Sequence, residues 1–178
     1  MNLKHAAFAA AVVTTILQLS CGPRTVDFDD PAVRQMVTLL MPERIIVEPF
    51  TGLKSFDDDD EPDGLEVVLR SQDSFGDPVK IAGLIRIELY AFNPASGEAK
   101  GRHIEQWDIP LVTTQDQRTY WNPFTQMYEI PLELDLASTT PADKYVIAIV
   151  YNTPLGEHMF TEYFFKPPLP TETGLASQ

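Results

Sequence analysis

Two long segments in which apolar and polar residues alternate strictly constrain the fold of this chain most. One segment is Gly83–Asn93, whose apolar set is Ile85, Ile87, Leu89 and Ala91. The other begins at Tyr128, and its apolar set is Tyr128, Ile130, Leu132, Leu134 and Leu136. A period of two over this length is typical of a β-strand with one buried face. We therefore predict a fold built mainly from strands.

The segment before the first of these strands has the same pattern. In Leu65–Arg70, the residues Leu65, Val67 and Leu69 are predicted to face inward. Between Leu65–Arg70 and Gly83–Asn93 lies Asp73–Pro78, which is rich in turn-forming residues. The sequence therefore predicts that Gly64–Asn93 is a β-hairpin.

Further strands are predicted along the rest of the chain, with turn signals between them. Their ranges are 43–50, 102–111, 144–151 and 157–166. The segment Lys144–Tyr151 is apolar on both faces, which indicates a central strand, and Val112–Gln126 is predicted to be a long connection. About seven strands between Arg44 and Lys166 favour an antiparallel β-sandwich. One short helix is predicted before them, with Asp29 or Asp30 as its cap, Pro31 at its first position and Ala32–Met41 following, ended before Pro42. A strand or irregular segment is the alternative.

The N-terminus has the pattern of an export signal. Lys4 precedes the apolar run Ala6–Leu17, which is shorter than the roughly 20 residues that span a bilayer. Ser20 and then Cys21, the only cysteine of the chain, follow at once. This segment resembles the lipobox of bacterial lipoproteins, although Gln18 stands where that family usually has leucine. The resemblance implies cleavage before Cys21 and acylation of Cys21; the alternative is a plain secretory signal with a free thiol.

The predicted organisation follows from these segments. Residues 1–20 are a signal peptide, 21–42 a lipid-anchored tether with the short helix, 43–167 the β-sandwich domain and 168–178 a disordered tail. The segment Pro141–Tyr151 resembles the late strand of immunoglobulin-like and transthyretin-like sandwiches. That resemblance implies that Tyr145, near the strand start, bonds back to the preceding corner.

Charge and residue content argue against several functions. The net charge is −13, or −14 once Lys4 is removed, so a nucleic-acid role is set aside. The expected mature chain has only His103 and His158 as histidines, each among polar residues, and the lipoprotein resemblance implies that its one thiol, Cys21, is acylated. No phosphate-binding loop or zinc motif is present in the sequence. We therefore predict no enzymatic activity and no cofactor.

Two clusters are candidate binding sites. The first is the aromatic set Tyr120, Trp121, Phe124 and Tyr128, with Asn122 and Gln126 near it. Aromatic rings stack on sugars and on partner side chains, and the alternative is that they plug one end of the core. Exposure of Trp121 separates these two interpretations.

The second cluster is the acidic loop, in which Asp59, Glu61, Asp63 and Gly64 match the start of a calcium loop. Arg70 stands where an EF-hand needs a bidentate glutamate, so only an irregular calcium site is compatible with this sequence. The alternative is a solvated, self-repelling loop.

Together these features predict an exported lipoprotein, anchored in a membrane of the bacterial cell envelope through its N-terminal lipid. Its sandwich is expected to be structural or to bind another envelope protein or polysaccharide. The alternatives are a carbohydrate-binding module that uses the Tyr120–Tyr128 cluster and a calcium-dependent binding domain. A hydrolase is a further rival.

Overall fold

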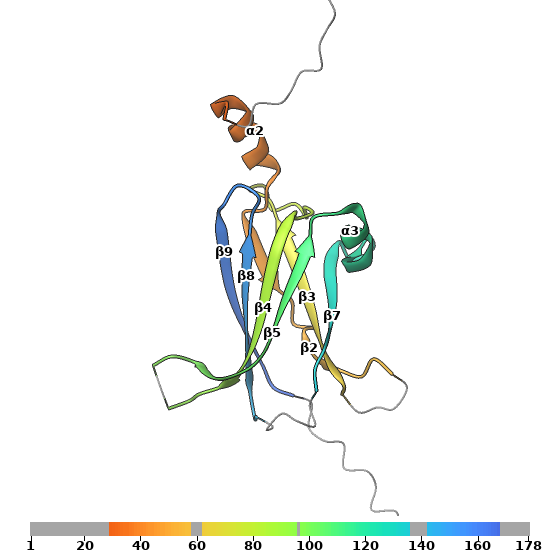
Figure 1. Ribbon diagram of the computed structural model, residues 1–178, viewed down its shortest axis with the longest axis vertical. Coiled ribbons are helices and arrows are strands. Elements are labelled where there is room, and N and C mark those ends of the chain that lie inside the picture. Colours follow the sequence, from red (N-terminus) through yellow and green to blue (C-terminus); the bar gives the residue numbers. More distant parts are fainter. Residues whose placement is uncertain (1–28, 58–61, 96, 136–141, 168–178) are drawn as a thin grey trace, which may run out of the picture. The chain divides into compact units, whose positions relative to one another are not determined.

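The described part of the chain is a mainly β structure with two antiparallel sheets. The computed structural model describes residues 29–57, 62–95, 97–135 and 142–167. One sheet has the order β1-β3-β7-β6, with β2 also paired to β3, and the other has the order β5-β4-β8-β9 (Figure 1). The predicted β-sandwich is confirmed, with nine strands in the described residues where about seven were expected.

The two sheets use strands from both halves of the chain. The strands of the first sheet are β1 (Arg44–Val47), β2 (Gly52–Lys54), β3 (Gly64–Gln72), β6 (Trp121–Asn122) and β7 (Met127–Glu133). The strands of the second sheet are β4 (Gly83–Phe92), β5 (Lys100–Leu111), β8 (Tyr145–Asn152) and β9 (His158–Phe165). The strands missing from the prediction are β2 and β6, which are too short to show an alternating pattern.

Helix α2 (Pro31–Leu40) begins at Pro31 and ends before Pro42, as predicted. Asp30 caps it, because its carboxylate accepts a hydrogen bond from the backbone N–H of Ala32 at 2.8 Å. The prediction of a helix is therefore confirmed over the strand alternative. The chain divides into two compact units between Val37 and Thr38, and all the strands belong to the second unit.

The predicted hairpin is wrong, because β3 and β4 lie in different sheets. A tight turn does form, in which the Asp73 carboxylate accepts hydrogen bonds from the N–H groups of Phe75 and Asp77. The chain then pairs briefly through Gln72 and Pro78 and crosses to the other sheet. Alternation identifies the inward face of a strand correctly, but it carries no information about the neighbouring strand.

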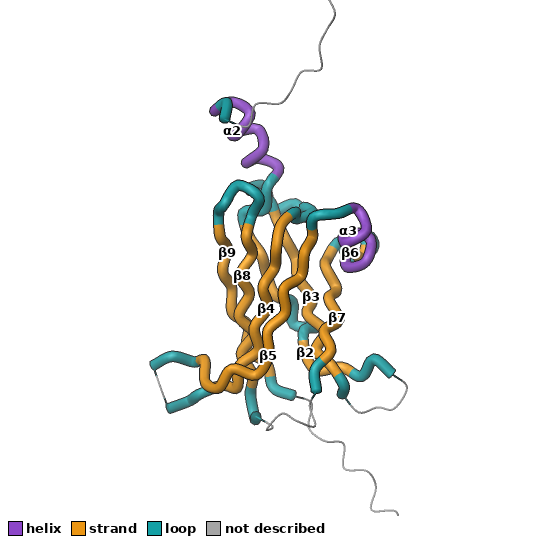
Figure 2. The backbone as a smooth tube through the Cα atoms, viewed as in Figure 1, coloured by secondary structure: helices purple, strands orange, loops and turns teal. Residues whose placement is uncertain are grey.

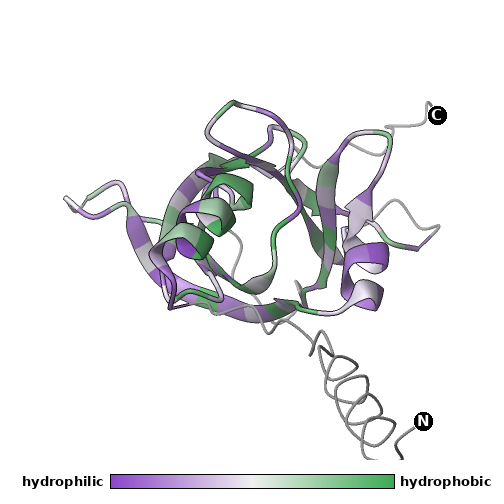
Figure 3. Ribbon diagram, turned by 90° about the horizontal axis from the view of Figure 1, so that it is seen from above, coloured by the Kyte–Doolittle hydropathy of each residue, from purple (hydrophilic) through white to green (hydrophobic). Residues whose placement is uncertain are grey.

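The inward faces themselves are confirmed. The predicted inward residues of β3, β4, β7 and β8 are buried between the sheets: Leu65, Val67, Leu69, Ile85, Ile87, Leu89, Ile130, Leu132, Ile147 and Ile149. Seen from above, hydrophobic and hydrophilic segments alternate along the strands around this interior (Figure 3). Strand β8 pairs with both β4 and β9, as expected of a central strand.

Three buried tyrosines bond to the backbone from inside the core. The Tyr145 hydroxyl accepts a hydrogen bond from Ala142 N–H at 3.2 Å, so the expected bond to the preceding corner is present. The Tyr151 hydroxyl donates to the Ala82 carbonyl at 2.7 Å, and burial raises the pKa of Tyr151 to about 12. The third is Tyr128, which supports the candidate site.

Candidate functional site

The predicted aromatic cluster lies on helix α3 (Thr114–Tyr120), β6 and the start of β7. The predicted long connection Val112–Gln126 contains two elements that were not predicted, α3 and β6 (Figure 2). A capping box begins α3. The Thr113 Oγ1 atom accepts a hydrogen bond from the backbone N–H of Asp116, and the Asp116 carboxylate accepts one from the backbone N–H of Thr113. These hydrogen bonds lower the pKa of Asp116. The sequence Thr-Thr-Gln-Asp was the signal that could have predicted this helix.

Tyr128 is not part of a surface platform, and the prediction that it binds a ligand there is wrong. Its side chain is 0% exposed, because the alternation of β7 turns it into the core. Its hydroxyl accepts a hydrogen bond from Ile81 N–H at 2.9 Å and donates to Gln117 Oε1 at 2.7 Å. Burial raises the pKa of the Tyr128 hydroxyl, although these two hydrogen bonds lower it in part. Tyr128 therefore joins α3 to the core.

Trp121 lies between core and surface. Its ring meets the Tyr128 ring edge to face, with centroids 5.0 Å apart, and Lys80 Nζ lies 5.3 Å from the Trp121 centroid. Trp121 and Tyr120 are both half-buried against the core. Trp121 is thus held in one orientation by its neighbours while part of its ring remains accessible. The exposure test therefore gives an intermediate result for this residue.

Phe124 has the opposite environment, with 94% of its surface exposed. It lies at the tip of the β6–β7 hairpin, whose turn includes Gln126 at a φ of 56°. Asn122 holds this turn, because its Oδ1 accepts hydrogen bonds from the N–H groups of Phe124 and Thr125. Its Nδ2 donates to Glu129 Oε1 at 2.9 Å. A large apolar side chain is therefore presented to solvent on a turn that is fixed by hydrogen bonds.

These residues border an open hollow of about 470 Å³. Its lining combines aromatic rings with two carboxylates and an amide: Glu66, Thr119, Tyr120, Trp121, Asn122, Pro123, Phe124, Glu129 and Pro131. Glu66 forms an ion pair with Lys54 at 2.6 Å, and Glu129 accepts hydrogen bonds from Asn122 and Thr125. We call this site the aromatic hollow. Three of the four predicted aromatic residues line it, and the fourth, Tyr128, packs against the Trp121 ring from the core.

The other predicted site residues are not brought together in the described residues. Cys21, Asp59 and Glu61 lie outside the described ranges. Asp63 is exposed, and its carboxylate accepts a hydrogen bond from Phe56 N–H at 2.8 Å. Within the described ranges, no three acidic, histidine or cysteine side chains gather closely enough to hold a metal ion.

The two histidines of the described residues stand apart on the surface of the second sheet. His103 meets the Tyr90 ring edge to face at 5.1 Å, and His158 Nδ1 lies 2.6 Å from Asn152 Oδ1. Both side chains are exposed. They lie on β5 and β9, which are at opposite ends of the sheet order.

Comparisons with known proteins give no family. No family model matches the chain, and no curated protein matches it. One similar solved structure is MtrC from Shewanella baltica OS185, which is 15% identical with a TM-score of 0.47; the match covers 71% of this chain and 22% of that one. Another is catalytically inactive OgpA from Akkermansia muciniphila in complex with an O-glycopeptide (glycodrosocin) substrate, 8% identical with a TM-score of 0.39. That match covers 71% of this chain and 29% of the other. In the described part of the chain, neither helix has the length and apolar content needed to span a bilayer.

Proposed function

We propose that this protein is a lipid-anchored component of a bacterial cell envelope, and that its β-sandwich is a non-catalytic domain that binds another envelope component. The observation that carries the binding role is Phe124, which is exposed at the tip of a hydrogen-bonded hairpin beside the aromatic hollow. An exposed aromatic side chain on a fixed turn loses little conformational entropy when a partner covers it. Such residues are enriched at the centres of protein interfaces.

The anchor is supported by the sequence before the sandwich. Cys21 is the only cysteine of the chain and directly follows an apolar segment of export-signal length. An exported chain with one thiol cannot form an internal disulfide, and acylation gives that thiol a use. Two or more acyl chains attach a protein stably to a membrane, whereas one chain binds weakly.

Cys21→Ser should release the protein from the membrane. We expect the variant to move from the detergent phase to the aqueous phase in detergent partition, because it loses the acylated side chain. We also expect the precursor to remain uncleaved, which mass spectrometry of the N-terminus would detect. A variant that is cleaved normally and still partitions with detergent would contradict the lipid anchor, and the binding role of the sandwich would be unaffected.

The binding role is tested by Phe124→Ala, with Phe75→Ala as the matched control. Phe75 is also in a turn and is 78% exposed, but it is not part of the aromatic hollow. We expect immobilised protein to retain a component from the protein fraction of its native envelope, and Phe124→Ala to reduce this retention about tenfold or more, the effect of a 1.4 kcal/mol contact. Phe75→Ala should retain as much as the unmodified chain. Equal retention by the two variants would remove the aromatic hollow from the binding role.

Carbohydrate binding is the second candidate, and the accessible part of the Trp121 ring favours it. Trp121 and Tyr120 line the same hollow as the Asn122 amide and the Glu129 carboxylate, and sugars bind by stacking together with such polar groups. The same experiment with the polysaccharide fraction separates the candidates. Retention of polysaccharide that Phe124→Ala abolishes, without retention of protein, would favour the carbohydrate-binding module.

A further inference from the structure

Strand β9 is the least protected end strand among the described sheets. Proteins usually protect the terminal strands of a sheet by making them short, charged, bulged or interrupted by proline. In the described ranges, β1, β2 and β6 contain only four, three and two residues. Strand β5 is long, but its register with β4 shifts twice, and it carries several charged residues and a proline. Each of these strands therefore has a feature that discourages pairing with another chain.

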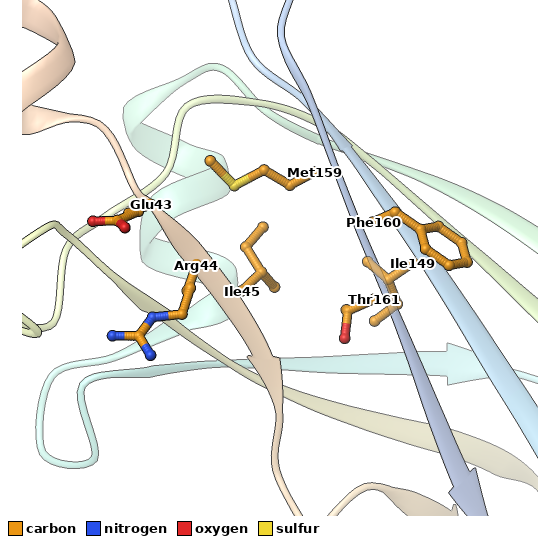
Figure 4. Close-up of a pocket in the computed structure, with 7 residues that line it drawn as sticks. All are labelled: Glu43, Arg44, Ile45, Ile149, Met159, Phe160 and Thr161. Atoms are coloured by element: carbon orange, nitrogen blue, oxygen red, sulfur yellow. The ribbon is translucent and has the colours of Figure 1, made fainter.

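Strand β9 has only one of these features, the charged residue Glu162. It pairs with β8 over eight consecutive residues without a register shift, and it contains neither proline nor lysine. Strand β1 approaches β9 from the other sheet, but in the described residues the two form no ladder. A hollow of about 140 Å³ lies where they meet, bordered by Ile45, Met159 and Thr161 among others (Figure 4). In the described residues, β9 is the last strand of its sheet and forms a ladder only with β8.

The outward face of β9 carries two exposed aromatic side chains. Phe160 is 59% exposed and Phe164 is 39% exposed, and Glu162 lies between them on the same face. This order is symmetric about Glu162. A second copy of β9 running antiparallel, with Glu162 opposite Glu162, would place each Phe160 opposite a Phe164. Aromatic cross-strand pairs stabilise antiparallel sheets.

The local charges permit two copies to approach, although the whole chain has a net charge of −13. Lys100 Nζ lies 3.2 Å from Glu162 Oε1 and 5.3 Å from the centroid of Phe160. Lys144 Nζ lies 4.8 Å from the centroid of Phe164. The glutamate at the symmetry centre therefore has its own cation, so that two copies bring together two ion pairs. Without such a cation, Glu162 of one copy would repel Glu162 of the other copy.

We infer that β9 is the site at which a second copy of this chain binds, joining the two β5-β4-β8-β9 sheets into one continuous antiparallel sheet. Residues that lie opposite each other across the new strand pair must both be even-numbered or both be odd-numbered. Only then do the outward side chains of one copy meet the outward side chains of the other. The register centred on Glu162 satisfies this condition and pairs Phe160 with Phe164 twice. The resulting interface is isologous, the commonest arrangement in homo-oligomers.

Cysteine cross-linking in native membranes tests this inference with the full chain. Glu162→Cys places one thiol at the symmetry centre, where opposite Cα atoms in an antiparallel pair are about 4.5–5.5 Å apart, within the span of a disulfide. Gln106→Cys is the matched control, because Gln106 is an exposed residue of β5, at the other end of the same sheet. After mild oxidation we expect at least about tenfold more disulfide-linked dimer from Glu162→Cys than from Gln106→Cys. The unmodified chain gives the background from Cys21.

A second measurement tests the register. Phe160→Cys and Phe164→Cys should each cross-link poorly alone, because like positions are offset by four residues, or roughly 13 Å along each strand. Cells that express both variants together should form the mixed dimer. Equal dimer yields from Glu162→Cys and Gln106→Cys would overturn the dimer. Efficient cross-linking by Phe160→Cys alone would overturn the register centred on Glu162.

Discussion

Replacing Ile147 with alanine should lower the free energy of unfolding by about 2–5 kcal/mol, the usual range for truncating a buried aliphatic side chain. Ile147 is fully buried in β8, the strand between β4 and β9, and it pairs with Leu89 on one side and Tyr163 on the other. The cavity left by the lost atoms would lie in the core between the two sheets, which can relax only slightly to fill it. Urea denaturation, followed by circular dichroism, measures the change.

Glu133→Ala is the control for this prediction. Glu133 is the last residue of β7 and its side chain is exposed. Its backbone carbonyl accepts a hydrogen bond from Trp107 Nε1 at 3.3 Å, and alanine keeps that carbonyl. We expect a change of about 0.5 kcal/mol or less. Comparable losses from Ile147→Ala and Glu133→Ala would contradict the assignment of inward and outward faces.

Tyr128→Ala should cost about 3–5 kcal/mol, the range for truncating a large buried aromatic side chain. The substitution removes a fully buried ring and also the hydroxyl that bonds to Ile81 and Gln117. An N–H group at Ile81 that loses its partner adds to the cost, because a buried polar group without a hydrogen bond is unfavourable. Trp121 would lose the ring on which it packs, so its fluorescence should change as well. Urea denaturation of a Trp107→Phe background, in which Trp121 is the only tryptophan, reports both effects.

Phe124→Ala is the matched control, since Phe124 belongs to the same aromatic cluster but contacts solvent. Its removal should change the free energy of unfolding by about 0.5 kcal/mol or less. A loss as large as that of Tyr128→Ala would mean that Phe124 packs into the protein. In that case Phe124 could not serve as the exposed contact that the proposed binding role requires.

Local patterns in the sequence determine the elements of this fold and their inward faces. The alternation in β4 and β7 places Ile85 and Ile130 in the core because successive side chains of a strand point to opposite faces. Asp30 and Pro31 mark the start of α2. The Asp30 carboxylate accepts a hydrogen bond from an N–H of the first turn, and Pro31 has a helical φ and no N–H that would lack a partner. These are interactions between residues close in the chain, so the sequence alone is enough to predict them.

Pairing between strands was decided only by the tertiary structure. Strands β3 and β4 are separated by a turn, yet their apolar faces meet across the core from opposite sheets. Two strands joined by a turn can pair side by side or pack face to face, and both arrangements bury the same residues. The choice depends on contacts with β7 and β8, which lie far along the chain.

The candidate site shows the same division. The sequence places four aromatic residues within nine positions, but only the fold separates Tyr128, which is in the core, from Phe124, which is in solvent. Gln117 of α3 bonds to the Tyr128 hydroxyl, and the Trp121 ring packs against the Tyr128 ring. Likewise, Lys100 of β5 reaches Glu162 of β9 although β4 and β8 lie between these strands in the sheet order. Distances of this kind arise from the packing of distant strands, and no local pattern encodes them.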